Sequence, residues 1–319
     1  NMNGGNADAD GRRYKRQDSK FKLYQSLPGH GNEGAEFFTM DNQAYLATCS
    51  VDSGPKPPFT NFTYQKLYRW DGKYFYPVQQ FYGYAAKAWK YFTVGDKKFL
   101  ALANGVTLPN TPKTIDRRSV IYQWNGKKFI PFQYFDTKWG YDFTSFSIGK
   151  EQFLGLTDHL IPSKLYRWNG KKFEDFQSFD KSGGRQFYFF TIGDKKFLAL
   201  ANINQPSTIY VWQNQQFKLF QSLPGKGGRS FLYFKQNGKD YLLKLLFITG
   251  TRQAPKADQQ SPIYEFTNGK FKQVATIATS GAVKASLFKN GKLSFIAIAN
   301  SLSKDIRYNT PAKIYQLGK

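Results

Sequence analysis

The decapeptide Gly-Asp-Lys-Lys-Phe-Leu-Ala-Leu-Ala-Asn occurs at residues 95–104 and again, without a change, at residues 193–202. Weaker copies begin at Gly149, Gly238 and Gly291, and residues 41–48 form a degenerate sixth copy. A chain of 319 residues is longer than one ordinary hydrophobic core supports, so it contains either two domains or one domain built by repetition. The duplicated decapeptide favours repetition.

A second marker, a phenylalanine that usually follows a lysine, recurs with the same period. It occurs at Phe21, Phe75, Phe129, Phe173, Phe217 and Phe271. The interval of roughly 45 to 55 residues is typical of propeller blades and of helical arrays. Helical arrays need a hydrophobic period of about 3.6 residues. The units instead contain short apolar runs separated by Asn-Gly, Asp-Gly and Gly-Asp turns, so we expect blades made of strands.

Each unit contains four strand signals. The first is an aromatic run, as at residues 187–192, and the second is the apolar part of the decapeptide, which suits a strand buried on both faces. The third is Ile-Tyr-x-Trp, as at residues 121–124 and 209–212. The fourth is the phenylalanine marker strand, which follows a tight turn such as Asn125-Gly126. With 31 Phe, 21 Tyr and 6 Trp, the composition is that of an all-β protein.

The last unit ends at Lys319, directly after its third strand. In the simplest arrangement residues 21–26 supply the missing fourth strand, which closes the ring and removes exposed sheet edges. We therefore predict a single β-propeller domain of six four-stranded antiparallel blades at residues 18–319, preceded by a flexible basic tail at residues 1–17. A worn seventh unit at Tyr14-Lys15-Arg16 is the alternative.

The composition limits the chemistry. Lys and Arg number 46 against 22 Asp and Glu, a net charge of +24, so acidic partners are expected; the alternative is that the charge only confers solubility. The single cysteine, Cys49, excludes an internal disulfide framework. The two histidines, His30 and His159, are too few for a multi-histidine site, and we expect neither a metal nor a cofactor. No apolar run reaches the roughly 20 residues of a membrane span.

The order of the strand signals resembles the EAR repeat, also called the EPTP or epitempin repeat. The resemblance rests on aromatic-Phe-Thr-x-Gly, Phe-Leu-Ala-Leu-Ala-Asn, Ile-Tyr-x-Trp-Asn-Gly-Lys-Lys-Phe and Phe-Gln, and it extends over nearly all of residues 21–319. It implies an extracellular β-propeller that acts in protein recognition or adhesion without enzymatic activity, as in the leucine-rich glioma-inactivated proteins. Such propellers are usually described as seven-bladed, whereas six units are clear here. The chain has no leucine-rich repeats, so the receptor partners of those proteins do not transfer to it.

Lysines recur in the turns after the first and the third strand of the units. Because the strands of a blade are antiparallel, both sets of turns lie on the same face of the disc. A ring of positive charge binds polyanions by counterion release. We predict a polyanion site at Lys97, Lys98, Lys127, Lys128, Lys171, Lys172, Lys195 and Lys196. The alternative is that these lysines only solubilise the turns.

The opposite face carries the long connections within blades and the connections from one blade to the next. The connections between blades are expected to converge on the mouth of the central channel. There we predict an aromatic and cationic cup that holds a sulfated or carboxylated sugar by stacking and charge-assisted hydrogen bonds. Its residues are Lys87, Trp89, Trp139, Tyr141, Arg185 and Arg229. The alternative is that the tryptophans pack between blades.

Catalysis finds little support in the sequence. Glu33, Glu36 and Asp142 are expected near the channel, but no carboxylate pair recurs with a fixed role and neither histidine has a nucleophile beside it. A cation bound at Asp142 remains open. We predict a secreted, non-enzymatic binding module, lectin-like or adhesive, for acidic glycans such as heparin or for acidic extracellular proteins, with no specific nucleic-acid partner. A propeller that binds a protein receptor through its loop face is the alternative, and the oligomeric state does not follow from the sequence.

Overall fold

Both copies of the decapeptide form a tight turn followed by a buried strand. Gly95 and Gly193 have positive φ angles of 58° and 55°, a conformation that glycine adopts at little cost. The residues that follow form β6 (Lys97–Ala103) and β14 (Lys195–Asn202), and most of their side chains are buried. Each of these strands is the second of a four-stranded sheet.

The structure is a computed structural model that describes residues 24–29, 32–51, 62–105, 116–251, 253–290, 293–304 and 312–318. The first blade consists of β1 (Asn32–Met40), β2 (Gln43–Ser50), β3 (Phe62–Trp70) and β4 (Phe75–Tyr84), and the second of β5 (Ala88–Val94), β6, β7 (Ser119–Trp124) and β8 (Phe129–Phe135). The third consists of β9 (Gly140–Ile148), β10 (Glu151–Asp158), β11 (Ser163–Trp168) and β12 (Phe173–Phe179), and the fourth of β13 (Gly184–Ile192), β14, β15 (Ser207–Gln213) and β16 (Gln216–Leu223). The fifth consists of β17 (Gly228–Gln236), β18 (Lys239–Leu246), β21 (Asp258–Thr267) and β22 (Lys270–Ser280), and the sixth of β23 (Ala282–Asn290), β24 (Leu293–Asn300) and β25 (Lys313–Gln316). A small hairpin of β19 (Thr249–Gly250) and β20 (Pro255–Lys256) interrupts the fifth blade.

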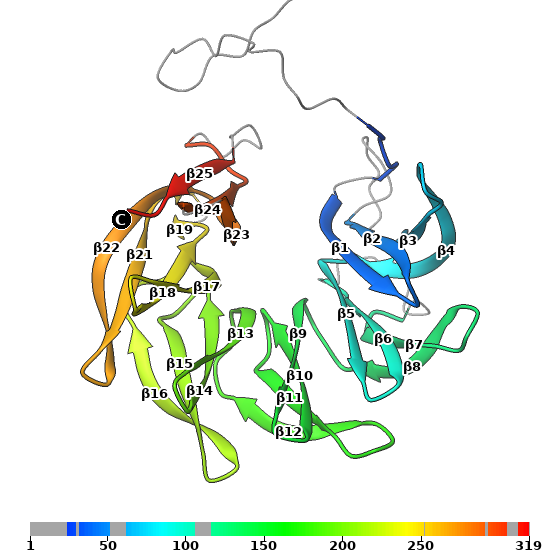
Figure 1. The fold of residues 1–319 in the computed structure, drawn as a ribbon, viewed down its shortest axis with the longest axis horizontal. Coiled ribbons are helices and arrows are strands. Elements are labelled where there is room, and N and C mark those ends of the chain that lie inside the picture. Colours follow the sequence, from blue (N-terminus) through cyan, green and yellow to red (C-terminus); the bar gives the residue numbers. More distant parts are fainter. Residues whose placement is uncertain are drawn as a thin grey trace, which may run out of the picture.

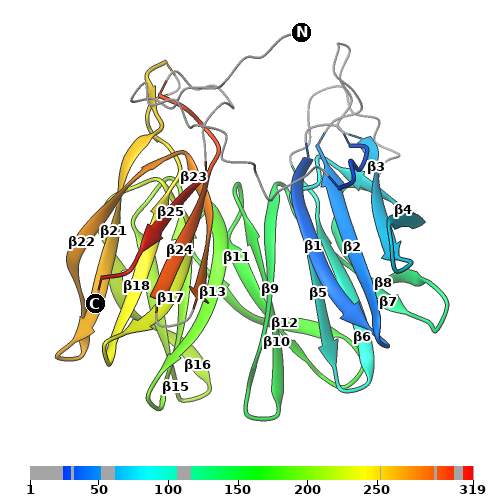
Figure 2. The same ribbon diagram turned by 45° about the horizontal axis from the view of Figure 1, so that its top comes forward.

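The blades are arranged around a common axis, with the first strand of each blade innermost (Figure 1). These inner strands contact one another in the order β1, β5, β9, β13, β17 and β23. Viewed from the side, the hairpins that join first to second strands point to the lower face of the disc (Figure 2). The prediction of an all-β propeller with six antiparallel blades is confirmed.

The second strand of a blade is buried because a neighbouring blade covers each of its faces. In β6, Leu100 belongs to the same apolar cluster as Leu67 of the first blade. The preceding residue, Phe99, packs instead against Phe173 of the third blade, with the ring centroids 6.4 Å apart. Side chains alternate between the two faces of a strand, so residues adjacent in sequence contact opposite blades. This explains why the decapeptide is continuously apolar.

A glutamine side chain joins the outermost strands of adjacent blades. Nε2 of Gln79 on β4 donates to the carbonyl oxygen of Phe129 on β8 at 2.6 Å, and Oε1 accepts from the backbone N–H of Phe129 at 3.0 Å. The same pair of bonds joins Gln133 to Phe173, Gln177 to Phe217, and Gln221 to Phe271. The outermost strand of a sheet lacks a ladder partner on one side. The glutamine supplies that partner, which accounts for the glutamine of the Phe-Gln motif. The marker phenylalanine contributes its backbone to these bonds and buries its ring, as at Phe129 and Phe173.

The last residue of the decapeptide holds the connection between two blades. Asn104 accepts a hydrogen bond from the N–H of Tyr84 at 2.9 Å and donates to the carbonyl of Arg118 at 2.8 Å. Asp158 and Asn300 likewise accept hydrogen bonds from backbone N–H groups of the preceding connection, whereas Asn202 donates to the carbonyl oxygen of Ser182 in that connection. A series of backbone hydrogen bonds of 2.8 to 3.0 Å also links successive connections: His159 N to Trp139 O, Gly183 N to His159 O, Ile203 N to Gly183 O, Gly227 N to Ile203 O, and Phe247 N to Gly227 O.

The closure of the ring differs from the prediction. In the described part of the chain the sixth blade has three strands, and residues 24–29 do not pair with β25. Gln25 instead forms with Phe75 of the first blade the two hydrogen bonds of the other glutamines, at 2.6 and 2.9 Å. Residues 24–29 thus take the position of a preceding fourth strand beside the first blade, while among the described residues no strand pairs with the outer edge of β25 (Figure 1). The predicted tail, the seventh-unit candidate and the first part of the predicted closing strand lie outside the described residues.

Removal of one glutamine leaves an N–H and a carbonyl group without their partners. We expect Gln177→Ala to lower the free energy of unfolding by about 1–3 kcal/mol, as measured by urea denaturation. Gln216→Ala is the matched control, because this glutamine is exposed on the neighbouring outer strand, and it should change the stability by less than about 0.5 kcal/mol. Equal effects of the two substitutions would contradict the role given to the repeated glutamine.

Candidate functional site

A glycine with little room for a side chain begins three of the inner strands. A Cβ atom on Gly140 of β9 would lie 2.7 Å from the backbone oxygen of Asn104, one on Gly184 of β13 would lie 2.2 Å from Oγ of Ser163, and one on Gly228 of β17 would lie 2.3 Å from Oγ of Ser207 and 2.9 Å from the backbone oxygen of Asn202. A larger residue would have to displace these atoms of the preceding blade. The residue after each glycine lies at the mouth of the channel. These three residues are Tyr141, Arg185 and Arg229.

Three cationic side chains surround the ring of Tyr141 on β9. Cζ of Arg185 lies 3.8 Å from the ring centroid, Cζ of Arg229 lies 5.2 Å from it, and Nζ of Lys87 lies 5.9 Å from it. The four residues come from four successive blades. Cations are attracted to the face of an aromatic ring, so Tyr141 forms the centre of the cup predicted from the sequence.

Among the described residues, neither Arg185 nor Arg229 forms an ion pair, although the charge of Arg229 acts on the buried carboxyl group of Asp142. Arg185 is 6% exposed, and its guanidinium donates one long hydrogen bond, 3.5 Å, to the carbonyl of Gly184. Burial lowers the pKa of Arg185 to about 10; the nearby Tyr141 opposes this shift and Arg229 adds to it. Arg185 remains charged at neutral pH, and an anion beside the two guanidinium groups would relieve their repulsion.

Trp139 and His159 lie beside Tyr141. The rings of Trp139 and His159 meet edge to face with centroids 4.7 Å apart, and Trp139 lies 5.9 Å from Tyr141. Burial, together with the charge of Arg185, lowers the pKa of His159 to about 4, so its ring is neutral at physiological pH. Nε1 of Trp139 and Nδ1 of His159 are buried without a hydrogen-bond partner in the described part of the molecule. Such atoms are rare in folded proteins. We call Lys87, Trp139, Tyr141, His159, Arg185 and Arg229 the channel-mouth cluster.

Trp89, the remaining residue predicted for the cup, lies elsewhere. Its side chain is 4% exposed and packs between the first two blades, 5.1 Å from the ring of Phe81. Its Nε1 donates to the carbonyl of Thr48 at 3.0 Å. The indole of Trp89 is therefore part of the core, as the alternative for the tryptophans proposed, and it does not face a ligand in the channel.

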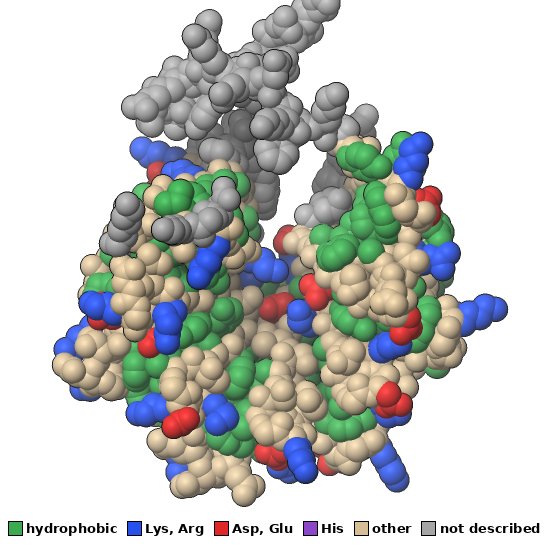
Figure 3. All heavy atoms as spheres, in the orientation of Figure 1, with side chains coloured by type: hydrophobic (Ala, Val, Ile, Leu, Met, Phe, Trp, Pro, Cys, Tyr) green, Lys and Arg blue, Asp and Glu red, His purple; other side chains and the backbone are tan. Residues whose placement is uncertain are grey.

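The channel is a cavity of about 560 Å³ between the inner strands. Figure 3 shows blue and red side chains around the central hollow. Two carboxylates there are paired with lysines, Glu33 with Lys87 at 2.9 Å and Glu36 with Lys90 at 3.0 Å. Asp142 accepts only a 3.3 Å hydrogen bond from a neighbouring glutamine side chain. Glu33 and Glu36 are thus paired with lysines, whereas Asp142 interacts with the charge of Arg229 without forming an ion pair.

The described residues contain neither a metal-ligand cluster nor a membrane-spanning helix. In these ranges no group of three or more His, Cys, Asp or Glu side chains is close enough to hold a metal ion. Nor do the described residues contain a helix long and apolar enough to cross a membrane. His30 lies outside the described residues, and Cys49 is a buried free thiol.

The turn lysines are presented on hairpins at the lower face of Figure 2. Lys97, Lys127, Lys128, Lys171, Lys172 and Lys195 are exposed, and Lys98 and Lys196 are half-buried. Lys98 pairs with Asp41 at 2.5 Å. Asn125 shapes its turn by accepting hydrogen bonds from the backbone N–H groups of Lys127 and Lys128, at 3.0 and 2.8 Å. Lys172 also lies 3.9 Å from a carboxylate oxygen of Glu174. The other exposed lysines of this set form no ion pair among the described residues, an arrangement that suits diffuse attraction.

Sequence reasoning did not single out His159, Lys90 and Lys284 as site residues. His159 follows the last residue of β10, and the two copies of the decapeptide are followed by Gly105 and Ile203. A titratable side chain at this position distinguishes the third blade from these two, and that difference could have identified His159 as a site residue. Lys284 and Asp142 occupy equivalent positions on β23 and β9, each paired with the residue one before the end of its second strand. Aligning the repeats strand by strand would have placed Lys284 in the channel.

The comparisons with known proteins agree with this architecture. The EPTP domain model matches residues 75–125, 128–169 and 172–213. The thrombospondin-type laminin G domain and EAR repeat-containing proteins of Homo sapiens and Mus musculus are each 32% identical to this chain over 145 residues, which cover 44% of this chain and 20% of the relative. The chain therefore spans about a fifth of the length of these curated relatives.

A solved structure supports the fold alone. The SapL1 lectin, in complex with alpha methyl fucoside, aligns with a TM-score of 0.50 over 89% of this chain and 92% of the lectin, at 9% sequence identity. The fold and the matched segments define a β-propeller that contains EPTP repeats. The resemblance to the EAR or EPTP repeat is thereby confirmed for residues 75–213 apart from the short gaps between the matches.

Asp142 provides a test of the channel electrostatics. Burial raises the pKa of its carboxyl group to about 6, although Arg229 and Lys284 act in the opposite direction. The unfolded chain has a pKa of about 3.9 for aspartate. A group whose pKa is raised by folding contributes stability below the unfolded pKa, and this contribution is lost as the pH rises through about 6.

We therefore expect Asp142→Asn to gain stability relative to the unaltered chain between about pH 4 and pH 7. The free energy of unfolding of the variant minus that of the unaltered chain should be about 1–3 kcal/mol larger at pH 7 than at pH 4. Urea denaturation at both pH values measures this shift. A difference that is the same at both pH values would show that the carboxyl group is not held in a desolvated channel.

Proposed function

We propose that this chain is a non-enzymatic extracellular binding module that recognises an acidic saccharide, carboxylated or sulfated, at the mouth of its channel. The observation that carries the proposal is the grouping of Lys87, Arg185 and Arg229 around Tyr141, with neither arginine paired to a carboxylate within the described residues. Unpaired cations this close together raise the energy of the empty site, and an anionic ligand lowers it.

The aromatic members of the channel-mouth cluster favour a sugar over a simple inorganic anion. Sugar rings present apolar C–H faces that pack on aromatic rings, and their acidic substituents accept charge-assisted hydrogen bonds from guanidinium groups. Trp139 and His159 pack against Tyr141 and carry two buried nitrogen atoms without partners in the described part of the chain. The channel cavity of about 560 Å³ is lined by Lys87, Tyr141 and Arg229 of the cluster, and its volume lies within the usual range of 300 to 1,000 Å³ for small-molecule sites.

The turn lysines extend the proposal to longer polyanions. They lie on the face opposite the channel-mouth cluster, so one short ligand does not reach both sets. A long acidic chain, or several chains in an extracellular matrix, would contact several hairpins weakly and gain affinity by avidity. The extracellular setting is supported by the resemblance to EPTP-repeat proteins.

A protein-binding propeller is the second candidate. The specific observation in its favour is the segment between β18 and β21, which carries the β19–β20 hairpin and extends from the upper face of the disc (Figure 2). Variable loops on a rigid scaffold often carry specific protein recognition. Contacts of this kind depend on salt much less than polyanion binding does.

Isothermal titration calorimetry with a heparin-derived tetrasaccharide tests the proposal. We expect Arg229→Gln to weaken binding by at least about tenfold, which corresponds to about 1.4 kcal/mol. Lys195→Gln removes the same charge from a turn at the other face, and it should weaken binding by less than about twofold. Affinity should fall as the salt concentration rises, with a smaller salt dependence in Arg229→Gln.

Two results would overturn the acidic-saccharide site. One is equal weakening by Arg229→Gln and Lys195→Gln, which would mean that the tetrasaccharide responds only to net charge. The other is elution from immobilised heparin at the same salt concentration as from a plain cation exchanger, which would direct the search to a protein partner at the upper face.

A further inference from the structure

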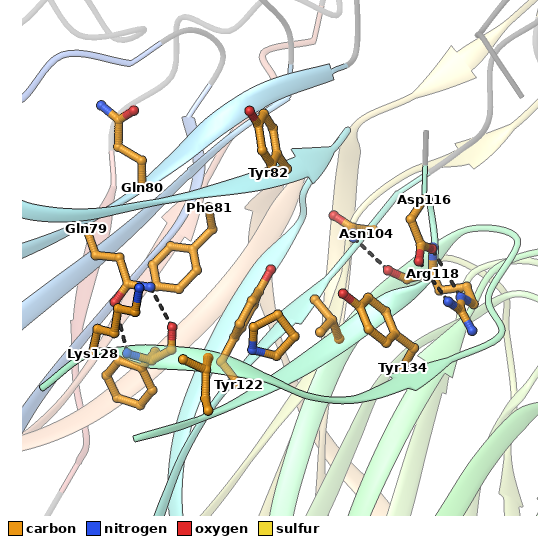
Figure 4. Close-up of a pocket in the computed structure, with 14 residues that line it drawn as sticks. Gln79, Gln80, Phe81, Tyr82, Asn104, Asp116, Arg118, Tyr122, Lys128 and Tyr134 are labelled. Atoms are coloured by element: carbon orange, nitrogen blue, oxygen red, sulfur yellow. Dashed lines mark hydrogen bonds and ion pairs between the residues drawn. The ribbon is translucent and has the colours of Figure 1, made fainter. Parts of the chain in front are cut away.

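The wall between the first and second blades contains a second cavity, of about 500 Å³, lined by β4, β7 and β8. We propose that this inter-blade cleft is a binding site for a neutral saccharide, separate from the channel. Figure 4 shows Tyr82 of β4 and Tyr134 of β8 at its sides, Asp116 and Arg118 at one end, and Lys128 at the other.

The tyrosines of the cleft depart from the pattern of the repeat. Counting from the marker phenylalanine, the position of Tyr82 is held by Asp136 and Asp180 in the next two blades, and the position of Tyr134 by Ser178 and Ser222. The corresponding clefts farther along the ring are therefore bordered by small or acidic side chains. Only the cleft between the first two blades combines two tyrosines at these positions in the matched repeats.

Both rings are available at the surface. Tyr82 is 60% exposed and Tyr134 is 41% exposed. The position of Tyr82 is fixed by Tyr64, whose ring lies 5.0 Å away and whose hydroxyl lies 3.3 Å from that of Tyr82. Exposed aromatic rings held at two sides of a cavity present flat apolar faces to a ligand.

Arg118 and Asp116 form a neutral polar pair beside Tyr134. Cζ of Arg118 lies 4.6 Å from the centroid of the Tyr134 ring. The same guanidinium makes two bonds to the carboxylate of Asp116, at 2.8 and 3.1 Å. Because the two charges offset each other, this end of the cleft offers fixed donors and acceptors with little net field. The third and fourth blades have prolines, Pro162 and Pro206, at the position of Arg118.

The hydroxyl group of Tyr122 points into the cleft (Figure 4). Tyr122 is 8% exposed and lines the cleft. Burial raises the pKa of the phenol well above its usual value, so the group is a neutral donor and acceptor. A neutral hydroxyl that faces a cavity offers a ligand atom a hydrogen bond.

Together these groups suit a pyranose ring. Its C–H face would pack on Tyr82 or Tyr134, and neighbouring hydroxyls would bond to the Asp116–Arg118 pair and to the hydroxyl of Tyr122. The channel differs in kind, because its arginines are unpaired and attract anions. The two sites are therefore proposed to bind ligands of different charge. Failure of neutral saccharides to bind the inter-blade cleft would not affect the proposal that the channel mouth binds an acidic saccharide.

Saturation-transfer difference NMR on the full chain tests the proposal, with the methyl pyranosides of glucose, galactose, mannose, fucose and N-acetylglucosamine as probes. At least one glycoside should show transfer to its ring protons, and Tyr134→Ala should weaken its affinity by at least about tenfold. Tyr82→Ala should also weaken it. Leu219→Ala removes a side chain that is 63% exposed on the outer strand of the fourth blade, and it should leave binding unchanged.

Thermal unfolding of each variant confirms that the fold is kept, which the exposure of both tyrosines favours. Transfer that is unchanged in Tyr134→Ala and Tyr82→Ala would overturn the site, as would loss of the same size in Leu219→Ala. Absence of transfer to every glycoside would overturn it as well. Arg229→Gln should have no effect on this signal, which separates the inter-blade cleft from the channel.

Discussion

Two hydrogen bonds between a glutamine side chain and the first residue of the next outermost strand recur around the ring. They satisfy backbone groups at the edge of each sheet, where no further strand follows. Each matched EPTP segment begins with the outermost strand of one blade and ends with the third strand of the next. A repeat therefore contributes to two blades. It has no core of its own, because the second strand must be covered from both sides.

The candidate site depends on the same contacts. In four blades an asparagine or aspartate at the end of the second strand binds the connection between blades, and the backbone bonds from one connection to the next define the mouth of the channel. Glycines with little room for a side chain then bring Arg185 and Arg229 to Tyr141. The cost of placing unpaired cations together is met by packing that lies outside the site, a common property of binding sites.

The fold was largely predictable because the same strand and turn signals recur in every repeat. Turn residues, alternating apolar positions and the spacing of the phenylalanines all indicate the same blade, so a weak signal in one repeat could be interpreted from the others. The role of the repeated glutamine was not predictable, since its partner lies in the next repeat, and neither was the lack, among the described residues, of a strand paired with the outer edge of β25. The positions of Tyr141 and the two arginines in the cup could be predicted, because the connections between blades are equivalent. The position of Trp89 could not. Side chains on its strand alternate between two environments, so a shift of one position along the strand moves a side chain from the channel into the core.

The central claim is that the channel mouth is an anion site made by unpaired cations around one tyrosine. The most direct measurement is a crystal structure of the full chain grown with a sulfated disaccharide. The account predicts density for a sulfate group within hydrogen-bonding distance of Arg229, near Tyr141 and Lys87. Density confined to the turn lysines at the opposite face, with the channel mouth holding only water, would contradict it.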